Sequence, residues 1–80
     1  MRWYVQKQEE NNDNILINYS YETNDTCDGL LKYDKYSNKI TIEKISAGAD
    51  EFATKWLFSH IYRLMNENQL NEKRYMVAIG

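Results

Sequence analysis

Hydrophobic and polar residues alternate with a period of two through the first half of the chain and with a helical period through most of the second half. Alternation places successive side chains on opposite faces of an extended strand, so it is typical of strands that bury one face. The clearest case sets four apolar or aromatic residues against a more polar face, namely Ile15, Ile17, Tyr19 and Tyr21 against Leu16, Asn18 and Ser20. The pattern predicts four strands, at residues 2–8, 15–22, 27–34 and 39–45.

Polar turn sequences separate these strands and determine how they pair. Residues 11–13 (Asn-Asn-Asp) form a three-residue loop, a common hairpin length, and an odd loop places Trp3 opposite Tyr21. Residues 37–38 (Ser-Asn) form a two-residue loop, which matches Tyr33 with Ile42. With these loops, successive hairpins keep one apolar face together, and Tyr19, Tyr21 and Tyr33 all belong to that face.

A helix is expected from Glu51 to about Asn68, with Asp50 as its N-cap, because an Asp there accepts hydrogen bonds from unpaired amides. Its apolar residues recur at steps of three and four, which predicts one buried face made of Phe52, Ala53, Trp56, Leu57, Ile61, Leu64 and Met65. Phe58 and Tyr62 are displaced from this face, so they either cover sheet edges or extend an interaction surface.

The expected fold class is therefore α+β, with the order ββββαβ and a mainly antiparallel sheet of four or five strands covered on one face by the helix. The whole chain, residues 1–80, forms one small domain, since it contains no Gly/Ser-rich or Pro-rich linker. Residues 75–79 form a closing strand with two open placements. It lies antiparallel beside the first strand, which we favour, or parallel to the fourth through a right-handed crossover.

Composition bears on the cellular compartment of the protein and on whether it associates with a membrane. The net charge is -2, aromatic residues make up 14% of the chain, and there is a single cysteine, Cys27. A small secreted domain usually carries several disulfides, and Gln6 and Lys7 interrupt the apolar stretch that a secretory signal needs. The longest apolar runs are three residues, far short of the roughly 20 that a membrane span requires. We therefore expect a cytoplasmic protein that does not associate with a membrane.

The chain offers little for catalysis or cofactor binding. Cys27 and His60 are the one candidate pair for a thiolate nucleophile and its base, but no third orienting residue accompanies them. Residues 24–29 resemble the start of a calcium loop, yet Lys35 stands where that loop requires a bidentate Glu. We interpret residues 23–26 as a turn, with Gly29 at a bulge or in a left-handed conformation. No cofactor, metal site or enzymatic activity is expected.

Two kinds of binding remain. Aromatic sheets can stack single-stranded nucleic acid, but phosphate binding needs clustered Lys and Arg, and acidic residues interleave with the lysines of this chain. The sheet face away from the helix presents Tyr4, Leu16, Leu30 and Met76 among polar residues. We expect a protein-interaction or regulatory module without enzymatic activity, which uses this face or an edge strand to bind a protein or a second copy of itself. Nucleic-acid binding is the alternative, and an enzyme using Cys27 and His60 ranks third.

Overall fold

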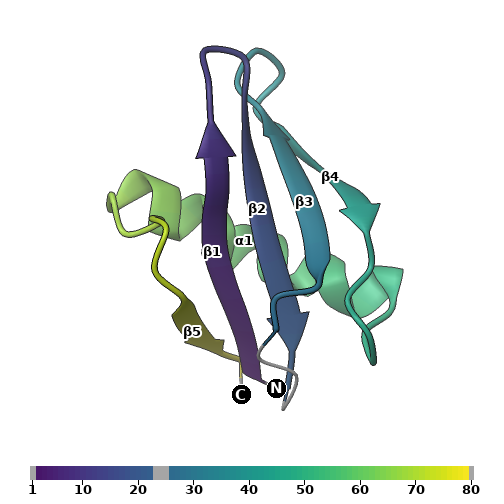
Figure 1. The fold of residues 1–80 in the computed structure, drawn as a ribbon. Coiled ribbons are helices and arrows are strands. Elements are labelled where there is room, and N and C mark those ends of the chain that lie inside the picture. The colour runs from purple at the N-terminus through teal and green to yellow at the C-terminus, as the bar shows by residue number, and fades with distance from the viewer. Residues whose placement is uncertain (1, 23–25, 80) are drawn as a thin grey trace.

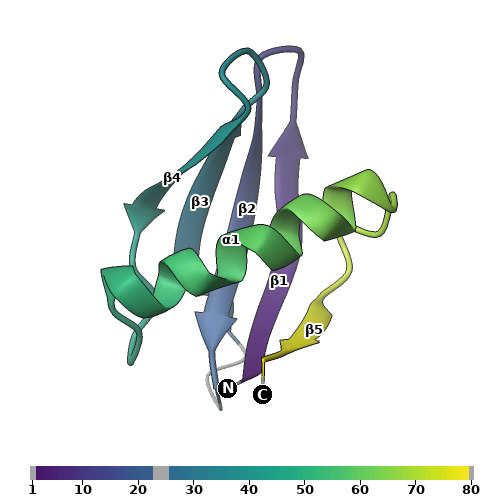
Figure 2. The same ribbon diagram turned by 180° about the vertical axis from the view of Figure 1, so that it is seen from behind.

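The computed structural model describes residues 2–22 and 26–79, which form one five-stranded antiparallel sheet with a helix across one face (Figures 1 and 2). In chain order the elements are β1 (Arg2–Glu10), β2 (Asn14–Tyr21), β3 (Gly29–Asp34), β4 (Lys39–Lys44), α1 (Glu51–Asn66) and β5 (Tyr75–Ala78). The strand order is β4-β3-β2-β1-β5, and each neighbouring pair is antiparallel. The predicted α+β class and ββββαβ order are confirmed.

The last strand takes the favoured placement beside β1, where Trp3 lies opposite Val77 and Tyr4 opposite Met76. The helix crosses the sheet from the β4 side to the β1 side, so the chain that follows it returns at the edge of β1 (Figure 2). There the Lys7 N–H donates to the Asn71 carbonyl at 2.7 Å, which satisfies part of that edge. The parallel crossover to the fourth strand is wrong.

The β1–β2 hairpin keeps the predicted pairing of Trp3 with Tyr21, but loop length is not its whole cause. A bulge between Lys7 and Glu9 shifts the register, so that Glu9 lies opposite Leu16 nearer the turn. The paired numbers therefore sum to an odd value beside the loop and to an even value beyond the bulge. One extra residue in a strand makes this change, and sequence alternation alone gives no sign of it.

The β3–β4 hairpin differs from the prediction by two residues. Tyr33 lies opposite Ile40, not Ile42, because the loop has four residues (35–38) instead of two. The Asp34 carboxylate accepts the N–H groups of Tyr36 and Ser37, at 2.8 and 3.3 Å. Asn38 has a left-handed φ of 59°. These local bonds start the turn early. A shift of two residues leaves the side chains from Lys39 to Ile42 on their expected faces, and a bulge at Glu43 then places Lys44 opposite Leu30.

The connection between β2 and β3 includes the turn predicted at 23–26, of which residues 23–25 lie outside the described residues. Gly29 takes neither of its two expected roles, since it is not left-handed and pairs with Tyr19 without a bulge in the β2–β3 register; Cys27 is left-handed instead, with a φ of 52°. Gly29 instead lies opposite Tyr19 and leaves room for its ring. A Cβ atom at Gly29 would lie 2.7 Å from the Cδ1 and Cζ atoms of that ring, well inside van der Waals contact.

The core lies between the sheet and α1. Its largest fully buried side chains come from all three central strands and the helix, and include Trp3, Val5, Ile17, Tyr19, Leu31, Leu57, Ile61 and Leu64. Tyr21 and Tyr33 are partly buried and pack against this cluster. The three tyrosines predicted to face the helix therefore do so.

The helix begins as predicted, since the Asp50 side chain accepts the Ala53 N–H at 2.7 Å. Its buried residues are Thr54, Leu57, Ile61 and Leu64. The inclusion of Phe52 and Trp56 in the core is wrong: these side chains are 74% and 57% exposed. At 3.6 residues per turn, Phe52 projects roughly 160° and Trp56 roughly 120° from the centre of the buried stripe.

Candidate interaction surface

The sheet face away from the helix holds the four residues that the sequence singled out. Tyr4 pairs with Met76, and Leu16 lies diagonally across from Leu30, since Leu16 is opposite Lys32 and Leu30 is opposite Asn18. Met76 is 53% exposed, and the other three are half-buried. The four thus share a face, as the strand alternation predicted, and whether they bind a partner stays a prediction.

This open face is not a continuous apolar patch. The paired residues Gln6 and Asn18 form a polar row between the Tyr4–Met76 pair and the two leucines. The Arg74 guanidinium lies 5.2 Å from the centre of the Tyr4 ring, a cation–π distance, so this aromatic face is already in contact with a side chain. Scattered exposed apolar residues of this kind are normal on a protein surface.

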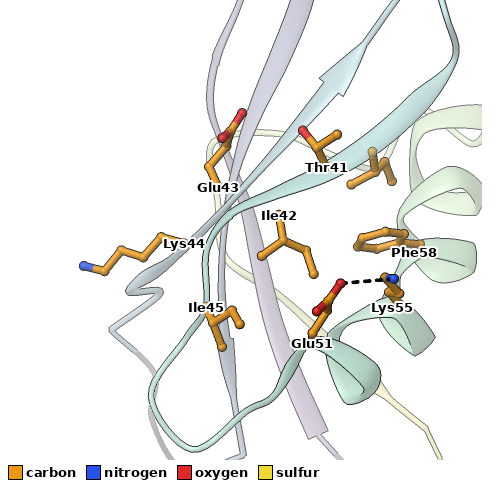
Figure 3. Close-up of a pocket in the computed structure, with 9 residues that line it drawn as sticks. Thr41, Ile42, Glu43, Lys44, Ile45, Glu51, Lys55 and Phe58 are labelled. Atoms are coloured by element: carbon orange, nitrogen blue, oxygen red, sulfur yellow. Dashed lines mark ion pairs between the residues drawn. The ribbon is translucent and has the colours of Figure 1, made fainter.

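A more apolar surface lies at the β4 edge, between this strand and the first half of α1. It contains a groove of about 490 Å³ lined by Ile42, Ile45 and Phe58, with Glu51 and Lys55 on its helix side. Figure 3 shows Ile42 and Phe58 turned toward the space between the strand and the helix. Ile45, which also lines the groove, is 44% exposed and is one of the large hydrophobic side chains that remain accessible to solvent.

Two exposed aromatic residues continue this surface on the outer side of the helix. Phe52 and Trp56 contact each other edge to face, with ring centroids 6.3 Å apart. Lys55 lines the groove and also the shallow depression beside these two rings, so the two parts adjoin. We name this set of residues, Ile42, Ile45, Phe52, Trp56 and Phe58, the β4–α1 surface.

Hydrogen bonds of Tyr19 and Asp28 hold the chain between β4 and α1 in one position. The Tyr19 hydroxyl accepts the Ser46 N–H at 3.1 Å and is 3.1 Å from the Thr54 hydroxyl. The Asp28 carboxylate accepts the Ser46 hydroxyl at 2.6 Å and the Ala47 N–H at 3.2 Å. Because these bonds join β2, the start of β3 and the helix, they fix the angle at which α1 leaves the β4 edge. The groove is thus built into the fold.

Charges on the β4–α1 side are mixed in sign. Lys55 forms an ion pair with Glu51, with 3.2 Å between Nζ and Oε1, and Glu43 and Lys44 follow each other at the end of β4. Nucleic-acid sites gather positive charge to contact phosphates. The electrostatics of this surface therefore suit a partner that also carries both signs.

A separate polar cluster joins the two hairpin ends far from the groove. The Glu10 carboxylate contacts Lys35 at 2.8 Å and Lys7 at 2.9 Å. Hydrogen bonds from Lys35 and then Lys7 lower the pKa of Glu10 below its ordinary value of 4.5. The pKa of Asp34 is also lowered, chiefly by the N–H groups of Tyr36 and Ser37. Lys35 thus serves to link β1 to the β3–β4 turn.

The structure does not bring Cys27 and His60 together. Cys27 is buried and accepts a hydrogen bond from the Ser20 hydroxyl at 3.8 Å, and the pairing of Ser20 with Tyr4 places that contact on the open face of the sheet. His60 belongs to α1, which covers the opposite face. The sheet thus lies between the two residues.

Sequence reasoning missed the β4–α1 surface for an identifiable reason. It counted Phe52 and Trp56 toward the buried face of the helix, although the 3.6-residue period places both side chains outside it. A helical projection of residues 51–66 holds this signal. The suggestion that Phe58 covers a sheet edge or extends a surface agrees with its place in the groove.

Comparisons of the chain with protein-family models, curated proteins and solved structures gave no match. Within residues 2–22 and 26–79, no helix combines the length and the apolar character needed to cross a membrane. The same residues contain no group of three or more His, Cys, Asp or Glu side chains placed to hold a metal ion.

Proposed function

We propose that this chain is a cytoplasmic protein-interaction or regulatory module without enzymatic activity, and that its β4–α1 surface binds an extended segment of a protein chain. The segment adds to the sheet beside β4, and its apolar side chains enter the groove. The free edge of β4 beside an apolar groove, with Phe52 and Trp56 exposed on the outer side of the neighbouring helix, carries this proposal. Aromatic residues are enriched in protein interfaces and dominate their energetics.

The combination of an edge strand with an apolar groove favours a protein strand over other ligands. An edge strand presents unpaired backbone N–H and C=O groups, which another strand can satisfy. In strand addition, main-chain hydrogen bonds supply affinity and pockets for alternate side chains supply specificity. The groove beside Ile42 and Phe58 offers such a pocket on the helix side of an added strand.

The rival assignments have less support from the described residues. Tyr19 is fully buried, and Tyr21 and Tyr33 pack against the core, so these rings offer no open stacking platform.

The cytoplasmic location rests on the single cysteine of the chain, because small proteins of oxidising compartments usually carry several disulfides.

Matched surface variants test the proposal. The variant Phe52→Ser/Trp56→Ser changes the β4–α1 surface, and Met76→Ser changes a position on the open face that is about as exposed as Trp56. Tagged protein is used for capture from native lysate, with mass spectrometry, and for titration with a fluorescent single-stranded oligonucleotide at low salt. We expect one or more proteins to be captured by the wild type and by Met76→Ser but not by the double variant.

Two results would contradict the proposal. Loss of the captured protein with Met76→Ser, and not with the double variant, would move the binding site to the open face. Tight oligonucleotide binding that weakens steeply with salt would favour the nucleic-acid alternative. Circular dichroism of each variant controls for loss of fold.

A further inference from the structure

The β4 strand combines a free edge with an unusual arrangement of side chains. β3 is its neighbour on one side, and it ends the sheet on the other. Ile40 and Ile42 face the helix, at 8% exposed and half-buried, whereas Lys39, Thr41 and Glu43 are exposed. The exposed edge therefore has one apolar side and one polar, charged side.

The sequence of this edge is complementary to its own reverse. Read in either direction, Lys39-Ile40-Thr41-Ile42-Glu43 gives charge, isoleucine, threonine, isoleucine, charge, with opposite signs at the two ends. Antiparallel pairing of the segment with itself, centred on Thr41, sets Ile40 opposite Ile42 of the partner subunit. The same register sets Lys39 opposite the partner's Glu43. Two-fold symmetry repeats each of these pairs.

We propose that the protein strand bound beside β4 is β4 of a second copy of this chain. This inference rests on the proposed function, since it names the occupant of the same surface. The two sheets join edge to edge through Lys39–Glu43, with Thr41 on the two-fold axis. Both helices then lie on the same face of the joined sheet, because the axis is perpendicular to it.

Alternative self-pairings of the strand are less favourable. A shift of one residue sets Ile40 opposite an exposed position, either Thr41 or Glu43 of the partner subunit, and so breaks the separation of the two faces. A shift that centres the pair on Ile42 sets Ile40 opposite the partner's Lys44. The register centred on Thr41 is the one that joins isoleucine to isoleucine and lysine to glutamate.

The groove lies where side chains of the second copy's β4 would enter it. It borders Ile42, and in the proposed register the partner's Ile40 comes directly opposite Ile42, on the helix side of the sheet. Phe58 and Ile42 already turn toward this space (Figure 3). The first turns of α1 lie on the β4 side of the sheet (Figure 2), so they extend the cover toward an added strand.

Lysines and bulges are also devices that keep edge strands apart, and β4 has both. Its bulge falls at Glu43, since Ile42 lies opposite Leu31 and Lys44 opposite Leu30. The charge pattern distinguishes the two roles. Charges of one sign repel any second copy, whereas Lys39 and Glu43 attract one in a single register. The bulge ends the paired segment at Glu43, so the paired edge is short and the dimer is weak.

Charge reversal tests the register directly. Sedimentation equilibrium of the wild type over about 1 μM to 1 mM covers the range of weak association. We expect a reversible dimer, and a loss of about tenfold or more in association for Lys39→Glu and for Glu43→Lys, because each sets two like-charged pairs across the interface. The double variant Lys39→Glu/Glu43→Lys restores association to within about threefold, since the swapped charges attract again.

A mixture of the two single variants gives a second readout. Each single variant repels its own copies, but the Lys39→Glu chain complements the Glu43→Lys chain at both ends of the pair. We expect a heterodimer in the mixture when neither variant associates alone. All changed side chains are exposed, so thermal unfolding should show native folding throughout.

A wild type that stays monomeric at 1 mM would overturn the inference, and so would a dimer that is indifferent to both single reversals. These results differ from failure of the proposed function. A monomeric chain that still captures another protein through Phe52 and Trp56 would retain the interaction surface and refute self-pairing alone.

Discussion

Substitution of Gly29 by alanine tests how the fold fixes the β4–α1 surface. The new methyl carbon would lie 2.7 Å from the Cδ1 and Cζ atoms of Tyr19. The Tyr19 ring is fully buried, and its hydroxyl bonds to the Ser46 N–H and lies at hydrogen-bond distance from the Thr54 hydroxyl. The ring therefore has to move against a packed core, and its hydroxyl bonds have to stretch or break.

The expected loss of stability follows from three contributions. Overpacking of a core costs about 1–3 kcal/mol, and each weakened hydrogen bond of the tyrosine adds about 1 kcal/mol. Replacing glycine in a strand returns about 0.5–1 kcal/mol, because alanine loses less conformational entropy on folding. We expect a net loss of about 2–4 kcal/mol in the free energy of unfolding for Gly29→Ala. For a domain of this size that corresponds to a fall of about 10–25 °C in Tm.

Urea unfolding followed by tryptophan fluorescence measures the effect, since Trp3 is fully buried and changes environment on unfolding. Tyr19→Phe provides a double-mutant cycle. Without its hydroxyl the ring has no hydrogen bonds to lose, so Gly29→Ala should cost about 2 kcal/mol less in that background, about 1 kcal/mol for each bond. Gly48→Asn is a matched control at a glycine with φ of 84°, where a Cβ meets nothing closer than 3.7 Å and asparagine tolerates the backbone. A change below about 0.5 kcal/mol for Gly29→Ala would refute the reasoning.

Three further predictions concern the helix and the hairpin ends. Asp50→Ala removes the bond to the Ala53 N–H and should lower the free energy of urea unfolding by about 1 kcal/mol, with most of it kept in Asp50→Asn. Phe52→Ser and Trp56→Ser should each change that free energy by less than about 0.5 kcal/mol, because both side chains are exposed, and a larger loss would return them to the core. The pKa of Glu10 is lowered in the folded state, so its stabilisation is present above its ordinary value of 4.5 and is lost as the pH falls through the folded pKa. Glu10→Gln should cost about 0.5 kcal/mol or less at pH 7 and flatten the acid limb of the stability curve, and an unchanged acid limb would contradict the ion-pair assignment.

Strand faces were predictable from the sequence because a period of two is a strong constraint where one face is buried. Tyr19 and Leu31 lie in the core as the alternation required. Pairing was less well defined, because a slip of two residues preserves every face. The alternation was therefore equally compatible with Ile42, the predicted partner of Tyr33, and with Ile40, its partner in the structure. Asp34 was the missing signal, since its carboxylate captures backbone N–H groups and begins the turn early.

The candidate site was harder to predict than the fold. An apolar residue on a helix indicates burial in general, and Phe52 and Trp56 depart from that rule because the sheet lies on one side of α1 only. Whether such a residue is buried or exposed depends on its angular position around the helix axis. The spacing argument did not take the angular positions of Phe52 and Trp56 into account. The open-face residues were placed correctly as a group, but their separation by Gln6 and Asn18 follows from the register across three strands.

The two edges of the sheet differ in a way that bears on the size of the proposed assembly. β5 has four residues and pairs with one end of β1, and the Asn71 carbonyl accepts the Lys7 N–H farther along that strand. β4 has six residues, two isoleucines facing the helix and an adjoining groove. Pairing of β4 with its own copy uses the same edge in both subunits, so the β4 edge of each subunit is paired in the dimer. A short β5 then ends the joined sheet on each side, which closes the assembly at two copies instead of propagating it as a fibre.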